Sequence, residues 1–475
     1  MSSIAEIPQP MTLRKARPLW HVSLLMFLLG AISNSIGYLT IAPTPVFMIY
    51  LAATVAALKV FDSSGKDERT AVVLISTICW FWAGIAAIYL KHVSDGAWGP
   101  DAPRFYEAMT SGEVAFEDGL AIIQYAGAVA IWRFFYDTFT FFGFAMGEYI
   151  GVTANVIFVA LTGMLGIKMV KAAFGPDPVR VRRFTIVFSW CGMFWLFAAT
   201  HLRDAIVLFL VTLLYLFWVS YLVTPSARTR IQLLIATLCG FFFFGLLRSE
   251  FVFVPIAMIL AGVAANIFGR QKGSKRGIVI VLVSLLVALP LAVFLVSTMF
   301  EDIFNSLSSG GERYDKVSIS EDGSASLGNT FIVTAPLPVR LVFGSAYVYL
   351  VPIPFWVGLM GDSVYHLFKS FHVLFMYAVM PLFGLALWRL VTDKSLRTPA
   401  ALFMVFCLCG FTQSVVLTSL EGRHLGAFIV PLLVLAVLPD MRKDADRHAY
   451  RFLLFVMLGG MLSVHLTWGA LKLLT

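Results

Sequence analysis

The chain has 475 residues, of which 59% are hydrophobic and 13% are charged, and its mean hydropathy is +0.86. A soluble domain carries about 25% charged residues, so the composition excludes an ordinary soluble enzyme. The net charge is +8, but it is not clustered with aromatic residues; we therefore expect no nucleic acid partner and attribute it to the loops of one membrane face.

Long apolar runs recur from one end of the chain to the other, and each can cross about 30 Å of hydrocarbon as a helix. We predict an all-α, polytopic integral membrane helical bundle of about 13 transmembrane helices (roughly 11–14), forming one transmembrane domain over residues 1–475. The first run lacks a small-residue cleavage site, which favours a retained helix over a signal peptide. The predicted spans are 19–38, 42–61, 70–91, 148–173, 184–201, 203–224, 231–248, 251–268, 278–299, 371–392, 400–420, 424–439 and 452–473.

Two external regions, 92–147 and 300–370, do not fit simple spanning helices. Residues 119–147 are rich in aromatic side chains, and the parity of the spans requires them to cross the membrane zero or two times. We predict interfacial helices there, with Arg133 and Asp137 one helical turn apart. Pro352 and Pro354 interrupt the run 340–358, which predicts a re-entrant or interfacial segment.

Charge is distributed unequally between the two sides of the predicted bundle. Of the 35 Lys and Arg residues, 24 lie on the side of the N-terminus and 11 on the other side. Of the 27 Asp and Glu residues, 9 lie on the side of the N-terminus and 18 on the other. By the positive-inside rule the N-terminus is cytoplasmic, and we expect a bacterial inner membrane protein whose acidic, active face is periplasmic.

All the cysteines lie inside hydrophobic runs, which predicts small buried side chains and neither a disulfide framework nor a zinc site. They are Cys79, Cys191, Cys239, Cys407 and Cys409.

Ionisable residues gather at the ends of hydrophobic runs on the acidic face, where they need a partner or a function. Considered singly, they fit plain structural roles, such as Asp204 or Glu148 at a helix N-terminus or Glu421 paired with Arg423. The short turns THLRDA and LEGRHL hold several charges at the membrane boundary, however, which equally predicts a joint site for an anion. The candidate residues are Asp101, Arg104, Tyr106, His201, Arg203, Asp204, Arg248, Glu250, Arg313, Arg423 and His424.

These residue types suit one reaction class. Guanidinium groups bind phosphate bidentately and stay charged, and a carboxylate or imidazole within hydrogen-bond reach accepts a proton from a sugar hydroxyl. A hydrophobic bundle accommodates a polyprenyl tail. Together they predict transfer of a glycan from a lipid-linked phosphate or pyrophosphate donor, with Arg offsetting the charge that grows on the leaving group.

Three segments resemble a known family. The first external loop, with Asp101 and Tyr106, resembles the acidic first loop of GT-C-type membrane glycosyltransferases and of EpsG- and Wzy-type polysaccharide (O-antigen) polymerases. The segments LRDAIVLFLVTLLYLF and GRHLGAFIVPLLVLAVLP resemble the Arg-bearing helix starts of those proteins. The resemblance implies an inverting transfer with Asp101 as the base, and Arg203, Arg248 and Arg423 as contacts to phosphate or pyrophosphate.

One departure from that family concerns the metal. GT-C enzymes often carry a paired acidic motif in the first loop, whereas Ala102 follows Asp101 here. Glu107 or Asp95 would have to supply the second carboxylate, so we assign no metal ligand and leave a divalent cation open. An O-antigen ligase fits less well, because the long external loop contains Arg313 but no His before His366.

We therefore predict a glycosyltransferase or polymerase that acts on undecaprenyl-linked sugars, with Asp101, His201 and Asp204 as catalytic residues and the other candidates as substrate contacts. Its partners would be the polyprenyl-linked donor and acceptor, the bilayer, and polysaccharide export or flippase proteins. The alternative is a transporter or flippase of lipid-linked oligosaccharide, which should place ionisable residues near the bilayer midplane and show two related halves. The predicted helix centres are nearly free of charge, which favours the enzyme. A non-catalytic subunit of an export complex is a third hypothesis.

Overall fold

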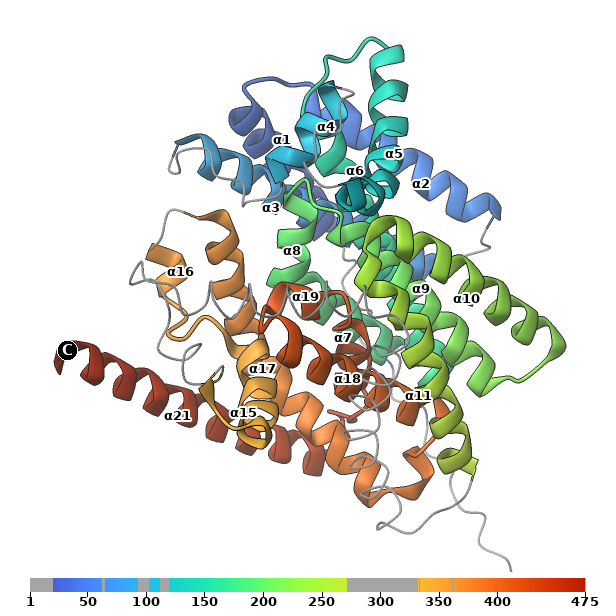
Figure 1. The fold of residues 1–475 in the computed structure, drawn as a ribbon, viewed down its shortest axis with the longest axis vertical. Coiled ribbons are helices and arrows are strands. Elements are labelled where there is room, and N and C mark those ends of the chain that lie inside the picture. The colour runs from blue at the N-terminus through green and yellow to red at the C-terminus, as the bar shows by residue number, and fades with distance from the viewer. Residues whose placement is uncertain are drawn as a thin grey trace, which may run out of the picture.

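A computed structural model describes residues 20–61, 65–92, 102–111, 119–270, 332, 334–360 and 363–474. Within these ranges every regular element is a helix (Figure 1). Nine helices in this part are long and apolar enough to cross a membrane. They are α1 (Trp20–Tyr38), α2 (Pro43–Phe61), α3 (Lys66–His92), α6 (Tyr149–Phe174), α9 (Asp204–Val223), α10 (Ala227–Leu247), α17 (Val364–Thr392), α18 (Pro399–Thr418) and α21 (Asp444–Leu474). The others are α4 (Ala102–Ser111), α5 (Gly119–Phe141), α7 (Pro178–Ser189), α8 (Gly192–Ala199), α11 (Phe253–Arg270), α15 (Leu337–Leu350), α16 (Val357–Met360), α19 (Gly422–Gly426), α20 (Val430–Ala436) and the 3-10 turns η1 (Ser249–Val252) and η2 (Lys394–Leu396).

This architecture confirms an all-α, multi-pass membrane helical bundle. Nine of the predicted spans coincide with the nine long helices, and the span predicted at 251–268 is the shorter apolar helix α11. The span predicted at 278–299 lies outside the described residues. The predictions at 184–201 and 424–439 are wrong as single spans, because each is divided into two short helices, α7 with α8 and α19 with α20.

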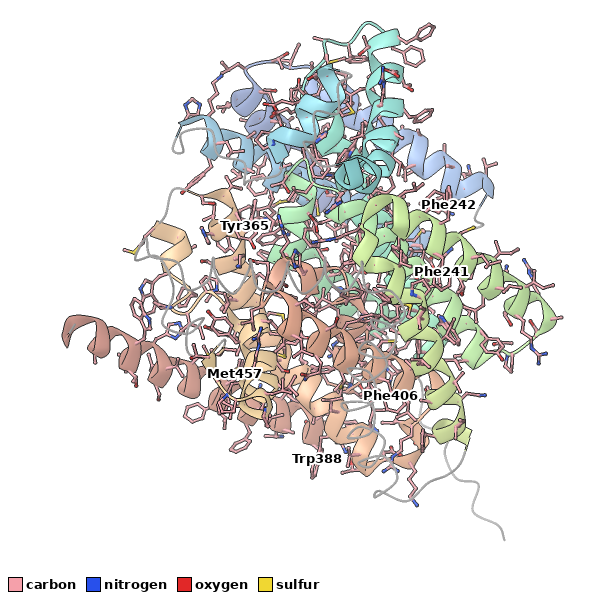
Figure 2. All side chains as sticks on the ribbon, viewed as in Figure 1. Phe241, Phe242, Tyr365, Trp388, Phe406 and Met457 are labelled. Atoms are coloured by element: carbon pink, nitrogen blue, oxygen red, sulfur yellow. The ribbon has the colours of Figure 1, made fainter. Side chains whose placement is uncertain are left out.

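The centre of the bundle consists of α6, α8 and α20. Every residue of α8 and α20 is buried, and so is most of α6. Helices α1, α2, α10 and α21 lie at the periphery and expose apolar side chains. Figure 2 shows Phe242 and Trp388 at the outside of the bundle and Phe406 inside it. An apolar exterior is what a helix presents to lipid, so the burial pattern agrees with a membrane protein.

The two divided helices owe their breaks to local chemistry. At the first break, between α7 and α8, the Trp195 indole donates a hydrogen bond of 2.8 Å to the Ser189 carbonyl, which the helix no longer uses. Gly192 then packs on α17, where an added Cβ would lie 2.6 Å from the backbone nitrogen of His372. At the second break, α20 begins with Pro431 in its first turn, where the missing N–H of proline costs nothing.

The segments predicted not to span are helical. Residues 119–141 form the single helix α5, and its predicted ion pair joins Arg133 Nε and Asp137 Oδ2 at 3.8 Å. The run 340–358 is divided between α15, which packs against α18, and the short helix α16. The prediction that all the cysteines are buried is wrong at Cys239, which is exposed on the peripheral helix α10.

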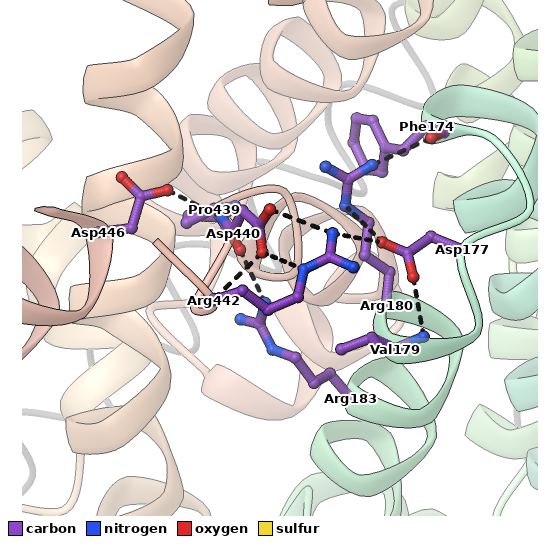
Figure 3. Close-up of polar contacts among 9 residues, drawn as sticks. All are labelled: Phe174, Asp177, Val179, Arg180, Arg183, Pro439, Asp440, Arg442 and Asp446. Carbon is purple, nitrogen blue, oxygen red and sulfur yellow. Dashed lines mark hydrogen bonds and ion pairs between the residues drawn. The ribbon is translucent and has the colours of Figure 1, made fainter. Parts of the chain in front are cut away.

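Polar contacts between helix ends gather at two places, which we call the site end and the opposite end. At the opposite end the α6–α7 loop meets the loop that precedes α21, where Arg183 donates to the Pro439 carbonyl at 2.7 Å and Arg442 pairs with Asp177 at 3.2 Å (Figure 3). Two of the basic segments that the sequence places on one face, 177–183 and 439–442, are thus in contact. The site end contains the turn 200–203, the C-termini of α10 and α18 and the N-terminus of α6.

Candidate functional site

The turn that joins α8 to α9 carries two of the candidate residues, His201 and Arg203, and is held by Asn155 of α6; a third, Asp204, follows it. The buried Asn155 amide donates to the carbonyls of Thr200 at 2.8 Å and Leu202 at 3.0 Å. Asp204 then begins α9, where its carboxylate faces the positive end of the helix dipole. The turn is therefore built against the core, and its polar side chains have defined positions.

Arg248 lies where α10 ends, and it joins two other segments of the chain. Its Nη1 lies 3.4 Å from Asp204 Oδ1, and its Nη2 donates to His424 Nε2 at 2.8 Å. Its guanidinium also lies over the Phe251 ring, 5.2 Å from the centroid. Arg248 is only 7% exposed, so the fold holds a buried guanidinium between a carboxylate and an imidazole.

The contacts of His424 define its tautomer. A guanidinium has donors and no acceptor, so His424 Nε2 must accept from Arg248, and the ring proton resides on Nδ1. Nδ1 lies 2.9 Å from Ser419 Oγ, which accepts a hydrogen bond from the Nδ1–H group. Burial lowers the pKa of His424 well below its usual range, and the nearby charges of Arg248 and Arg423 lower it further. His424 is thus a neutral hydrogen-bonding group at physiological pH.

Glu421 is the centre of a second set of contacts at the same end. Its carboxylate lies 3.0 Å from Lys369 Nζ, accepts a hydrogen bond from the Tyr365 hydroxyl and caps α19 through the Arg423 backbone nitrogen at 3.4 Å. Burial raises the pKa of Glu421, but Lys369 and Arg423 lower it more, so the net result is below its usual range. The carboxylate is ionised and engaged.

Arg203 and Arg423 extend these contacts toward the edge of the cluster. Arg203 Nη1 donates to the Leu247 carbonyl at 2.6 Å and its guanidinium lies 5.9 Å from the Phe105 ring centroid, which links α9, α10 and α4. The Arg423 guanidinium lies 5.9 Å from the centroid of Tyr365. Both arginines are half-buried, so they are more exposed than Arg248.

His201 points into an aromatic environment. Its ring centroid lies 4.2 Å from that of Trp132 and 6.1 Å from that of Tyr106, and Nε2 lies 3.4 Å from the Tyr136 hydroxyl. Burial lowers the pKa of His201 to about 3, so the imidazole is neutral. His201 therefore does not pair with Asp204, although both stand on one turn.

The structure brings together most of the predicted site residues. Arg203, Asp204, Arg248, Arg423 and His424 converge at the site end, and His201 with Tyr106 lies beside them. Asp101 and Arg313 fall outside the described residues, as do the side chains of Arg104 and Glu250, whose backbones lie in α4 and η1.

Tyr365 and Lys369 are not among the predicted site residues. The predicted span 371–392 begins after them, whereas α17 begins at Val364. The signal was available: Lys369 is a cation within an otherwise apolar stretch, and such a residue needs a partner. Arg340 of α15 is also absent from the predicted site residues. Its side chain donates to the Val416 carbonyl at 3.3 Å, near the C-terminus of α18.

The described residues contain no group of three His, Cys, Asp or Glu side chains placed to hold a metal ion. No protein-family model, no curated protein and no solved structure matches the chain. The resemblance to GT-C-type and Wzy-type proteins therefore stays a prediction, and a functional argument depends on the geometry of the site end.

Proposed function

We propose that this protein is a bacterial inner-membrane glycosyltransferase or polymerase that transfers sugars or repeat units from a polyprenyl-(pyro)phosphate donor. The observation that carries the proposal is the convergence of Arg248, Arg423 and Lys369 from three separate chain segments at one end of an apolar bundle. Guanidinium groups match the oxygens of phosphate and keep their charge when buried. The surrounding apolar helices suit a polyprenyl tail.

In this proposal the buried groups prepare the cations for the donor. Asp204 and His424 orient the Arg248 guanidinium, and Glu421 orients Lys369, so little rearrangement is needed when a phosphate arrives. Asp204 and Glu421 are both engaged by cations, which makes them positioning groups and not free bases. The base implied by the family resemblance is Asp101.

The orientation in the membrane is part of the proposal. The positive-inside rule assigns the opposite end to the cytoplasm and the site end to the periplasm. A reporter fused after Gly311 should be periplasmic, and one fused after Lys272 cytoplasmic. The reverse result would place the site end in the cytoplasm, where a donor on the outer leaflet does not reach it.

The test of the proposal uses arginine variants of the purified full-length protein. Arg423→Ala and Arg248→Lys should weaken binding of a polyprenyl pyrophosphate, because neither restores the bidentate contact. Arg442→Ala at the opposite end is the matched control and should bind normally. Cells that carry the two site variants should lose polymer. Normal donor affinity and normal polymer in both variants would sink the proposal.

A flippase or transporter of lipid-linked oligosaccharide is the second candidate, and the divided helices favour it. Transporters form substrate sites at discontinuous helices near the midplane; α7–α8 and α19–α20 are both discontinuous, and their second halves, α8 and α20, are buried. The break before α20 is apolar, however: Phe428 stacks on Phe411 at 4.1 Å. Reconstituted vesicles would distinguish the two, because a flippase moves the lipid without forming a new glycosidic bond.

A further inference from the structure

A second polar group lies next to the arginine site, and the proposed function does not use it. We call it the tyrosine cluster; it consists of Tyr38, Tyr106, Tyr136, Glu148 and His201, from α1, α4, α5, the N-terminus of α6 and the turn before α9. The Tyr136 hydroxyl joins its parts, at 3.4 Å from both the Glu148 carbonyl and His201 Nε2. Tyr38, Tyr106 and Tyr136 all lie close enough to feel the charge of Glu148.

Glu148 differs from the other carboxylates of the site end. It occupies the N-cap position of α6, yet its side chain makes no capping hydrogen bond there. Asp204 pairs with Arg248, and Glu421 pairs with Lys369. The charge of Glu148 instead acts on phenol groups, those of Tyr38 and Tyr106. Burial raises the pKa of Glu148 to about 6. A half-buried carboxylate of this kind holds and releases a proton near neutral pH.

The inner part of the tyrosine cluster is closely packed and has unused hydrogen-bonding capacity. His201 is 2% exposed, and its Nδ1 has no hydrogen-bond partner among the described residues. A Cβ on Gly151 would lie 2.2 Å from His201 Nε2 and 3.0 Å from the Tyr136 hydroxyl, so only glycine allows α6 to approach this closely. An unpaired buried polar atom is costly, and a hydroxyl-bearing ligand would satisfy it.

We propose that the tyrosine cluster is the acceptor subsite of the transferase, where a sugar hydroxyl binds and Glu148, in place of the Asp101 that the family resemblance implies, takes its proton. This inference rests on the proposed function. The acceptor oxygen bonds to the anomeric carbon of the donor sugar, the bond from that carbon to the phosphate oxygen breaks, and the phosphate leaves with the electron pair. The hydroxyl proton passes to the Glu148 carboxylate.

The chain connects the two halves of such a site. The turn 200–203 directs His201 into the tyrosine cluster and places Arg203 beside the end of α10, while Asp204 follows it and contacts Arg248. Donor phosphate and acceptor hydroxyl would therefore meet across one turn. Aromatic rings such as Tyr106 and Tyr136 offer the apolar faces and hydroxyls on which a sugar ring packs.

The first experiment measures the state of Glu148 without any activity. Dicyclohexylcarbodiimide attaches to protonated carboxyl groups in apolar surroundings, and mass spectrometry identifies the labelled peptide. In the detergent-solubilised full-length protein, Glu148 should be labelled at about pH 5 and lose most of its labelling by about pH 7, because its pKa lies between. Lipid-linked oligosaccharide extracted from the host should protect it. Absence of labelling at both pH values, or labelling at about pH 5 that the extract does not change, would contradict the subsite.

The second experiment separates the subsite from the proposed function. Glu148→Gln should bind polyprenyl pyrophosphate normally yet form product about 100-fold more slowly or worse, as loss of a general base does. Glu148→Asp should recover part of the rate with a shifted pH profile. Asp137→Asn, an exposed carboxylate on α5, is the control. Wild-type turnover in Glu148→Gln with a defect in Arg423→Ala would overturn the subsite alone; normal turnover in both would overturn the proposed function.

Discussion

The two ends of the bundle use the same residue types in different ways. At the opposite end arginine fastens loops: Arg183 binds a carbonyl, and Arg442 bridges Asp177 and Asp440 with its side chain 58% exposed (Figure 3). At the site end the polar side chains are buried and contact one another, as Arg248 does with Asp204 and His424. Backbone contacts and exposed ion pairs suffice to hold a loop, whereas buried titratable groups in mutual contact are typical of functional sites.

The cost of burial makes this difference informative. An ionised side chain loses several kcal/mol of hydration when it leaves water, and a well-packed apolar side chain would usually serve stability as well or better. At the opposite end the exposed pair of Arg442 with Asp177 avoids that cost, and the buried Asp446 is paired with the half-buried Arg389. The site end bears it at Lys369 and Arg248, both 7% exposed, which supports a role beyond holding the fold.

Removing Arg248 should have the largest effect. Arg248→Ala leaves Asp204 buried without its guanidinium, which we expect to destabilise the protein by about 3–5 kcal/mol and to abolish product formation. Thermal unfolding in detergent, followed by tryptophan fluorescence, would measure the loss. A stability equal to that of the wild type would show that losing a buried ion pair at the site end costs no more than losing an exposed one at the opposite end.

Crowding the tyrosine cluster should have the next largest effect. Gly151→Ala forces a methyl group against His201 Nε2, and we expect a loss of about 1–3 kcal/mol from overpacking. Gly143→Ala is not a suitable control, because Gly143 has a positive φ of 84°; Gly384→Ala is better, since nothing lies within 4 Å of its added Cβ. Equal melting temperatures for the two variants would mean that the cluster is loosely packed.

Neutralising Glu148 should stabilise the protein, and only at higher pH. The pKa of Glu148 in the folded protein, about 6, lies above its ordinary value of 4.5, so folding penalises the ionised form. The penalty is absent below about pH 4.5, grows between about pH 4.5 and 6, and is complete above, at about 1 kcal/mol after allowance for solvent screening. Glu148→Gln should therefore melt higher than the wild type at about pH 7 and equally at about pH 4. A lower melting temperature at neutral pH would show that the carboxylate is structural.

Breaking the exposed contacts of the opposite end should have the smallest effect. Arg442→Ala removes ion pairs to Asp177 and Asp440, which at such exposure contribute about 0.5 kcal/mol. Raising the salt concentration should shrink the difference further. A loss of unfolding free energy above about 2 kcal/mol would show that ion pairs at this end also contribute strongly to stability, and the contrast between the two ends would disappear.

Apolar run length predicted most of the helices, because about 20 apolar residues leave a membrane chain few alternatives. It failed at 184–201 and 424–439, where the breaks depend on contacts that run length does not reveal, such as the Trp195 indole at the Ser189 carbonyl and the packing of Gly192 on α17. It also placed the start of α17 too late, since polar residues such as Lys369 look like loop until Glu421 is known to lie beside them.

By itself the sequence determined that this is a membrane helical bundle and which charged turns share a face, because both follow from hydropathy and parity along the chain. It also singled out Asp204, Arg248 and His424 as residues at helix ends. Only the tertiary structure decided their partners: Arg248 between Asp204 and His424, Lys369 against Glu421, and Glu148 among tyrosines. Pairing and burial depend on how helices distant in sequence pack together, and these in turn determine which carboxylate is engaged and which is available to take a proton.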